Sequence, residues 1–511
     1  MEISGSGLNL EQVFQVAHQP QIKVKLSSEG RKKMRESRGY IEARIQAGDV
    51  MYGVNTGFGA FSSVRISDNE IEELQKNLIR SHSVGVGPLF SRAQTRAMML
   101  LRANALARGH SGIRDVVVDK ILEFLNHDIL PAIPQQGSVG ASGDLAPLSH
   151  LALALMGEGE ILTEKGEAQP AQEILKKMNV APLELKAKEG LSLINGCQVM
   201  TAIGLLDLYK AAQLLKLADI AGAMSLEALK GSRSAFDPLI SETRPHLGES
   251  KTAANLRKIL GASSEISLSH TACSRVQDAY SLRCMPAVHG ATKDVWQHCR
   301  SVLEVEANSS TDNPLVFAQE DKILSCGNFH GMPVAFAMDY AGIVFSALAS
   351  ISECRTAKLI NPAMNDGLPA FLTRQGGLNS GHMIVQVVAA SLVSENKVLA
   401  HPASVDTIPT SAEKEDHVSM GTIAARKFSQ ILENATQVIS LELLSASQGL
   451  DLLKPLKPTA GVERAYQVIR SQVPFAEKDR IFSFDQRLIR ELISKNTIVN
   501  EVENEVGSLT I

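Results

Sequence analysis

The sequence is poor in aromatic side chains, and this shortage narrows the fold. Phenylalanine, tyrosine and tryptophan make up only 4% of the 511 residues, and Trp296 is the single tryptophan. Alanine and leucine are abundant instead, which favours helices over sheets. With 44% hydrophobic and 21% charged residues, the composition is that of a globular protein of one to three domains.

Several protein classes are disfavoured by what the sequence lacks. A formal net charge of −4 offers no basic surface for nucleic acid. No basic stretch with an apolar core opens the chain and no apolar run approaches about 18 residues, so we expect neither a secretory signal nor a membrane span. The thirteen histidines form no HExxH cluster, which argues against a bound metal.

Cysteine usage indicates the compartment. The six cysteines form no CxxC pair, and in a chain of this length they are typical of reduced thiols in a cytoplasmic protein. They are Cys197, Cys273, Cys284, Cys299, Cys326 and Cys354.

The most informative stretch is residues 137–150, GSVGASGDLAPLSH. Three glycines precede a helical pattern in which Asp144 is expected to be the N-cap and Pro147 lies in the first turn. A glycine-rich turn before a helix is usually a tight connection or an anion site. No Gly-Lys-Ser/Thr follows, which argues against a nucleotide P-loop.

Small residues at Ala141-Ser142-Gly143 permit a reaction of the backbone itself. In a tightly bent chain the amide nitrogen of Gly143 can reach the carbonyl carbon of Ala141, because glycine has no side chain to obstruct the approach. Ring closure and loss of the Ser142 hydroxyl would remove two waters and leave a methylidene-imidazolone. None of the twenty side chains is electrophilic in this way, so such a group would decide the reaction class.

Residues 141–150 closely resemble the signature of the aromatic amino acid lyase family, which includes histidine, phenylalanine and tyrosine ammonia-lyases and related aminomutases. The resemblance implies 4-methylidene-imidazol-5-one formed autocatalytically, with Ser142 becoming 2,3-didehydroalanine and Ala141 cross-linked to Gly143, and no external cofactor. It also implies a mainly α fold, a long up-and-down central helix bundle with a smaller mixed N-terminal region that carries the catalytic loop. The corresponding regions are 1–110, 111–480 and 481–511.

Two N-terminal motifs agree with this family. Residues 51–59 hold three glycines and an asparagine and predict a loop, headed by Tyr52. Tyr52 on its own is as well explained as a structural residue, but the loop resembles the family's tyrosine-bearing loop. A helix predicted over 70–82 ends in Ser81-His82, which resembles the histidine-lyase form of the family's substrate-selecting pair.

Three more motifs lie further along the chain. Asn195 precedes a long apolar helix predicted over 198–229; it is either an N-cap or, by its Asn-Gly resemblance, a contact to the substrate amine or the reactive ring.

Gln277, Tyr280 and Arg283 recur every third residue and would share one helix face. An arginine one turn from a tyrosine favours tyrosinate and can bind a carboxylate. Phe329, in a glycine-rich loop, is expected to pack on the substrate ring.

Residues 412–420 are predicted to open the longest helix, which continues to near Leu453. Glu415 either stabilises the helix dipole or, by resemblance, is the histidine-lyase acid near the substrate imidazole. The family more often has Asn-Gln before this acid, whereas this chain has Glu413-Lys414. The departure affects local charge and ring specificity, not the reaction class.

Periodicity predicts the remaining elements. The pattern indicates a strand within 19–26, a surface excursion at 159–190, a helical tail from Ile481, and helices at 27–46, 92–108, 115–125, 252–260, 289–307, 332–358 and 383–400.

The resemblance implies conversion of L-histidine to trans-urocanate and ammonia by a homotetramer whose active sites combine residues of three subunits. The implied roles are β-proton removal by Tyr280, amine-proton transfer by Tyr52, carboxylate binding by Arg283, imidazole recognition by His82 and Glu415, and substrate contacts from Asn195, Gln277 and Phe329. One alternative is a tyrosine or phenylalanine ammonia-lyase or aminomutase on the same scaffold, against which Ser81-His82 and Glu415 argue. Others are a fumarase-type helical lyase without the modified group and a non-enzymatic helical scaffold.

Overall fold

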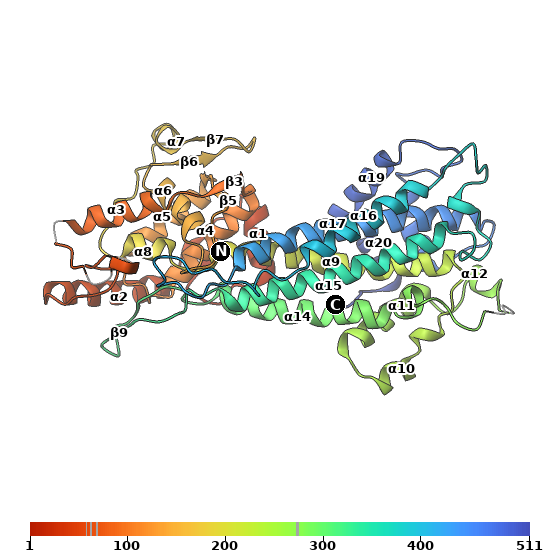
Figure 1. Cartoon of the computed structure of the whole chain (residues 1–511), viewed down its shortest axis with the longest axis horizontal. Coiled ribbons are helices and arrows are strands. Elements are labelled where there is room, and N and C mark those ends of the chain that lie inside the picture. The colour runs from red at the N-terminus through yellow and green to blue at the C-terminus, as the bar shows by residue number, and fades with distance from the viewer. Residues whose placement is uncertain (58, 62–63, 68–69, 272–274) are drawn as a thin grey trace. The chain divides into compact units, whose positions relative to one another are not determined.

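The computed structural model describes residues 1–57, 59–61, 64–67, 70–271 and 275–511. Phe58 of the loop motif and Cys273 lie outside these residues. The described chain is mainly helical, as predicted (Figure 1). It divides into two compact units. Unit 1 comprises Met1–Tyr209, Cys299–Asp339 and Pro402–Arg426, and unit 2 comprises Lys210–His298, Tyr340–His401 and Lys427–Ile511. The three regions expected from the sequence remain a proposal.

Unit 1 mixes helices with short strands. Its helices are α1 (Leu10–His18), α2 (Ser28–Gln46), α3 (Ile71–His82), α4 (Arg92–Ala107), α5 (Asp115–Asn126), α6 (Leu145–Leu155), α7 (Ala171–Met178) and α8 (Glu189–Ile194), with a 3-10 turn at Gly59–Phe61. Its strands are β1 (Glu2–Ile3), β2 (Lys25–Leu26), β3 (Val86–Leu89), β4 (Leu130–Pro131), β5 (Pro134–Gln136), β6 (Glu160–Leu162), β7 (Ala168–Pro170), β8 (Leu315–Phe317) and β9 (Lys322–Leu324).

The strands of the described residues form four small sheets. Strands β1 and β2 pair in parallel, with Glu2 opposite Lys25. The antiparallel sheets are β3-β5, β4-β6-β7 and β8-β9. The strand expected within residues 19–26 is therefore confirmed only at its last two residues. The surface excursion at 159–190 consists of the β6-β7 hairpin, α7 and the start of α8 (Figure 1).

Unit 2 is built from helices. Those wholly within it are α10 (Pro238–Thr243), α11 (Leu247–Leu260), α12 (Glu265–Leu268), α13 (Tyr280–Arg283), α16 (Met383–Leu399), α18 (Ala460–Arg470), α19 (Phe482–Ser494) and α20 (Thr497–Val506), with 3-10 turns at Ser234–Phe236 and Ala370–Leu372. Helices α11, α18 and α20 pack against one another.

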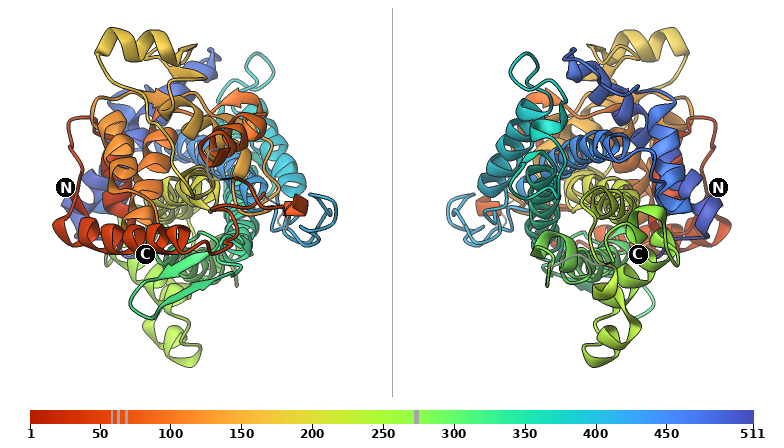
Figure 2. Two further views of the ribbon diagram at one scale, coloured as in Figure 1. Left: turned by 90° about the vertical axis from the view of Figure 1, so that its left-hand side faces the viewer. Right: turned by 90° about the vertical axis from the view of Figure 1, so that its right-hand side faces the viewer.

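Four long helices contribute residues to both units. They are α9 (Gln198–Ala228), α14 (Met285–Ala307), α15 (Met332–Ile360) and α17 (Gly421–Leu452). In Figure 2 the unit 2 part of α9 lies among other helices of that unit, in keeping with the nearly complete burial of Leu215, Ala218 and Ile220. An apolar character all round the helix is what such a position requires.

Helix α15 is the described helix that bears on the expectation of no membrane span. By length and composition it is the one described helix that could cross a membrane. Its most apolar window is 61% buried within the protein, and the core helix of a globular fold has the same composition.

Three helices of unit 1 position three of the sequence motifs. Helices α3, α6 and α8 contact one another pairwise (Figure 1). Helix α3 ends at His82, α6 begins just after Ser142, and α8 ends just before Asn195. Their mutual packing therefore brings three motifs together that are separated by 50 residues or more of sequence.

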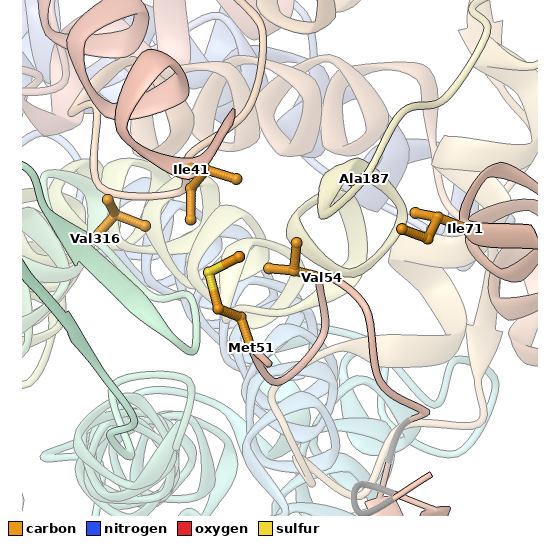
Figure 3. Close-up of a cluster of buried hydrophobic side chains, with 6 residues drawn as sticks. All are labelled: Ile41, Met51, Val54, Ile71, Ala187 and Val316. Atoms are coloured by element: carbon orange, nitrogen blue, oxygen red, sulfur yellow. The ribbon is translucent and has the colours of Figure 1, made fainter. Parts of the chain in front are cut away.

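A cluster of buried side chains anchors the loop that carries Tyr52. Met51 and Val54, on either side of Tyr52, are 6% and 0% exposed. They pack with Ile41 of α2, Ile71 of α3, Ala187 and Val316 of β8; Figure 3 shows Met51 and Val54 between these partners. The base of the loop is thus held by segments from four parts of the chain.

Two helix predictions were wrong. Helix α17 begins at Gly421. Residues 411–414 form a turn and 416–420 are irregular, and Ser411, Ala412, Glu413 and Met420 have positive φ. Helix α13 has four residues, so Gln277 does not share a helix with Tyr280 and Arg283. Most other predicted helices are confirmed to within a few residues, although the short helix expected at 252–260 begins earlier, at Leu247.

Candidate active site

A cavity of about 1160 Å³ in unit 1 collects most of the candidate residues. Its wall is made by the Tyr52 loop, the end of α3, the Ser142 turn, the end of α8, residues around 313–329 and the turn at 411–415. Six predicted side chains line it: Tyr52, His82, Ser142, Asn195, Phe329 and Glu415.

The turn that contains Ser142 has an unusual backbone. Ser142 and Gly143 have φ of 51° and 79°, the left-handed region that side chains disfavour. Residues Gly140 and Gly143 form a β-bridge across the turn. Gly196 pairs with the two residues on either side of Gly143. Its amide donates to the Ser142 carbonyl at 3.2 Å, and its carbonyl accepts from the Asp144 amide at 2.8 Å.

Gly143 has no room for a side chain. A Cβ built there would lie 2.2 Å from the carbonyl oxygen of Gly196. Ala141 is 9% exposed and packs on Val418 and Met420, and the Met420 amide donates to the Val139 carbonyl at 2.9 Å. The tripeptide is therefore bent and clamped from two sides.

Asp144 was predicted to cap α6, but its carboxylate makes no hydrogen bond to that helix. It stands at the N-cap position of α6 without a side-chain bond there. Its Oδ2 accepts from the amides of Val199 and Met200 at 2.9 and 3.0 Å, so it caps α9 instead. Burial raises the pKa of Asp144 to about 6, against the hydrogen bonds that lower it.

Tyr52 and His82 enter the cavity half-buried and uncharged. Burial, reinforced by the negative charge of Glu415, raises the pKa of Tyr52. Burial lowers the pKa of His82, whose Nδ1 lies 3.0 Å from the Ser81 hydroxyl. At neutral pH they therefore present a phenol and a neutral imidazole.

Glu415 faces Ser142. Its Oε1 accepts a hydrogen bond from the Ser142 hydroxyl at 3.2 Å, and its Oε2 accepts from the hydroxyls of Thr410 and Ser411 at 2.8 and 2.6 Å. Because Glu415 stands in a turn closed by its own pairing with Thr410, the helix-dipole explanation of this acid does not apply.

Asn195 is not the N-cap of α9; it follows the last residue of α8. Its Nδ2 donates to Asp312 Oδ1 at 3.2 Å and to the Asn313 carbonyl at 3.3 Å. Its Oδ1 is buried and finds no hydrogen-bond partner among the described residues. Phe329 contributes its half-buried ring to the same cavity.

Sequence reasoning missed the buried ion pair behind Asn195. Lys188 and Asp312 have side chains 0% and 1% exposed, with Nζ and Oδ2 2.9 Å apart. Burial by itself would raise the pKa of Asp312, but the Lys188 ammonium holds it below its usual value. The two residues are 124 positions apart, and neither belongs to a motif that single-sequence reading detects.

The other three candidate residues belong to unit 2 and do not line this cavity. Arg283 lies over the Tyr280 ring with its Cζ 4.6 Å from the centroid, and its Nη2 donates to Gln277 Oε1 at 3.1 Å. The three therefore lie together although they do not share a helix. Gln277 and Arg283 line a cavity of about 860 Å³ within unit 2, and Tyr280 is 71% exposed.

The described part of the chain contains no group of three or more histidine, cysteine, aspartate or glutamate side chains that could hold a metal ion.

Comparisons with known proteins cover nearly the whole chain. The model of the aromatic amino acid lyase family matches residues 8–471. A histidine ammonia-lyase of Sorangium cellulosum is 51% identical over 513 aligned positions, which cover 99% of this chain and 99% of that protein.

Solved structures are also similar in fold. The histidine ammonia-lyase of Trypanosoma cruzi is 41% identical with a TM-score of 0.91, and the alignment covers 99% of this chain and 95% of that one. The tyrosine aminomutase of Streptomyces globisporus is 35% identical with a TM-score of 0.94 over the full length of both chains. Sequence and structure therefore agree on the family.

Proposed function

The chain belongs to the aromatic amino acid lyase family, and we propose that it eliminates ammonia from L-histidine to give trans-urocanate. The observation that carries the proposal is one cavity lined by Ser142 and five further predicted side chains from separate segments of the chain. Full-length relatives that are histidine ammonia-lyases support the choice of substrate.

The residues present fit a 4-methylidene-imidazol-5-one made from Ala141, Ser142 and Gly143. Ser142 and Gly143 have the left-handed backbone of a tight turn, and the carbonyl of Gly196 excludes any side chain at Gly143. Such a group supplies an electrophilic centre that ordinary side chains lack. Loss of the Ser142 hydroxyl would remove its hydrogen bond to Glu415 and leave that carboxylate oxygen for a donor on the substrate.

Recognition of the imidazole ring falls to Glu415 and His82. A carboxylate accepts from a ring N–H, and a neutral imidazole such as His82 offers one donor and one acceptor to the ring nitrogens or to an ordered water. Phe329 gives the ring an aromatic surface. These contacts favour histidine over phenylalanine, which has no ring nitrogen.

Proton transfer is assigned to two tyrosines. Tyr52 keeps its phenolic proton because burial raises its pKa, so it can donate to the departing amine. Tyr280 is the base for the β-proton. Arg283 carries the charge that holds the substrate carboxylate, with Gln277 hydrogen-bonded beside it.

Gln277, Tyr280 and Arg283 reach the cavity from other copies of the chain. We base this on the family resemblance, which implies a homotetramer with shared sites, and on the exposure of Tyr280. An active site completed by a second subunit makes oligomerisation a condition for activity. On the family resemblance alone, we also propose that the enzyme is cytoplasmic and needs no external cofactor.

The substrate assignment is tested by incubating the purified protein with histidine, phenylalanine and tyrosine and following the ultraviolet absorption of the conjugated acid. We expect urocanate from histidine and little product from the other two. Cinnamate or coumarate in place of urocanate would instead assign the chain to a phenylalanine or tyrosine enzyme of the same family.

A further inference from the structure

The amide of Asn195 can adopt only one orientation at the cavity wall. The side chain is 2% exposed, and both groups that face its Nδ2, the Asp312 carboxylate and the Asn313 carbonyl, are acceptors. Turning the amide over would place its oxygen against two other oxygens and leave its NH2 without an acceptor. The NH2 end therefore faces Asp312.

This orientation leaves Oδ1 as the atom that Asn195 can offer to a ligand. It is buried and has no hydrogen-bond partner among the described residues. A buried acceptor without a partner needs a hydrogen-bond donor. The α-amino group of an amino acid is a donor, whereas the carbonyl oxygen of a modified backbone ring is not.

Asp312 is itself held by several donors. Its Oδ2 receives the Lys188 ammonium at 2.9 Å and the Ser192 hydroxyl at 2.8 Å, and its Oδ1 receives the Asn313 amide at 2.7 Å. A buried ion pair is seldom more stabilising than apolar residues of similar volume, so its presence directly behind Asn195 needs another reason. An ionised carboxylate can only accept hydrogen bonds, and this property fixes the orientation of the neighbouring Asn195 amide.

We propose that Asp312 is a positioning residue that turns the carbonyl oxygen of Asn195 into the cavity, where it accepts a hydrogen bond from the α-amino group of the substrate. Lys188 supports this by keeping Asp312 ionised. The inference rests on the proposed function and narrows the role of Asn195, which the family resemblance left open between the substrate amine and the modified ring.

The test compares two ligands that differ only in the amine. Imidazole-4-propanoate has the ring and carboxylate of histidine but no α-amino group. In Asp312→Asn the new amide at residue 312 can donate as well as accept. The Asn195 amide is then no longer held in one orientation. We expect kcat/KM for histidine to fall about 10- to 100-fold, while the Ki of imidazole-4-propanoate changes less than about threefold. A parallel loss for both ligands, or no loss for histidine, would overturn the proposal.

A second measurement separates positioning from general disruption. If Asp312 acts through Asn195, Asp312→Asn should have no further effect on kcat/KM in an Asn195→Ala background. Losses that simply multiply would contradict this. Thr311→Val is the matched control, because Thr311 is buried beside Asp312 but accepts from Gln198 and not from Asn195. In this variant kcat/KM for histidine and the Ki of imidazole-4-propanoate should keep their ratio to within about threefold of wild type.

Folding is controlled separately. Asp312→Asn strands the buried Lys188 ammonium, so Lys188→Met/Asp312→Asn, which removes both charges, is measured alongside it. Intact mass establishes whether each variant has lost two waters at residues 141–143. Failure of both variants to fold would assign the pair to folding and overturn the proposal. A wild-type protein that deaminates tyrosine rather than histidine would refute only the substrate assignment, and the test would then use tyrosine and its des-amino analogue.

Discussion

Gly143→Ala is expected to prevent formation of the modified group. The new Cβ would lie 2.2 Å from the Gly196 carbonyl oxygen and 2.4 Å from its carbon, and these are backbone atoms that cannot swing aside. Moving Gly196 away breaks its hydrogen bonds with Ser142 and Asp144. The tripeptide would then lose the bend that brings the nitrogen of residue 143 toward the carbonyl of Ala141.

The chain offers a matched control at Gly166. Its φ is +81°, against +79° at Gly143, but a Cβ there meets nothing within 4 Å. Gly166→Ala therefore carries only the left-handed strain of about 1–2 kcal/mol. Gly143→Ala adds overpacking of about 1–3 kcal/mol and two weakened backbone hydrogen bonds of about 1 kcal/mol each.

Gly143→Ala should thus unfold at a clearly lower urea concentration than Gly166→Ala, with a difference of about 3–5 kcal/mol in the free energy of unfolding. Intact mass should show no water loss and the histidine assay no urocanate, whereas Gly166→Ala should be cyclised and active. Equal stabilities, together with full cyclisation of Gly143→Ala, would refute the argument that Gly196 clamps the turn.

Met51, Asp144 and the pair Ser142 and Tyr280 provide three further tests. Met51→Ala, in the cluster beneath the Tyr52 loop, should lower the free energy of unfolding by about 2–5 kcal/mol and reduce kcat, as urea titration and the urocanate assay can measure; unchanged stability would contradict the cluster's role. Because the pKa of Asp144 is raised from 3.8 to about 6, its contribution to stability is complete below pH 3.8 and is lost as the pH rises through 6. Relative to Asp144→Asn, the wild type should therefore lose about 2 kcal/mol between pH 4 and 7, and a pH-independent difference would refute this. Ser142→Ala and Tyr280→Phe should each be nearly inactive, and co-expression of the two should restore activity through mixed oligomers; absence of any restored activity would argue against shared sites.

Local patterns were sufficient for most helices and for the motifs. The apolar spacing in α3 and α4 and the capping serines before α2 and α4 are decided by neighbouring residues, so their bounds follow from the sequence. The small residues around Ser142 likewise indicate a tight turn without any knowledge of distant contacts.

Two wrong predictions, the helix start at 412–420 and the cap by Asp144, have their cause in long-range contacts. The turn before α17 is held by the Val139 carbonyl, which accepts from Met420, and by the Ser142 hydroxyl on Glu415, so helical periodicity at 412–420 is overridden. Asp144 caps α9 rather than α6 because α9 begins beside it in space. The Lys188–Asp312 pair is equally invisible to any reading by period or motif.

The proposed activity requires the chain to build its electrophile from Ala141, Ser142 and Gly143. Mass spectrometry of the proteolytic peptide spanning residues 137–150, taken from freshly purified and folded wild-type protein, tests it most directly. We expect that peptide to be lighter than its sequence by two waters, with the matching Ser142→Ala peptide at full mass. A wild-type peptide at full mass in protein that still produces urocanate would contradict the claim.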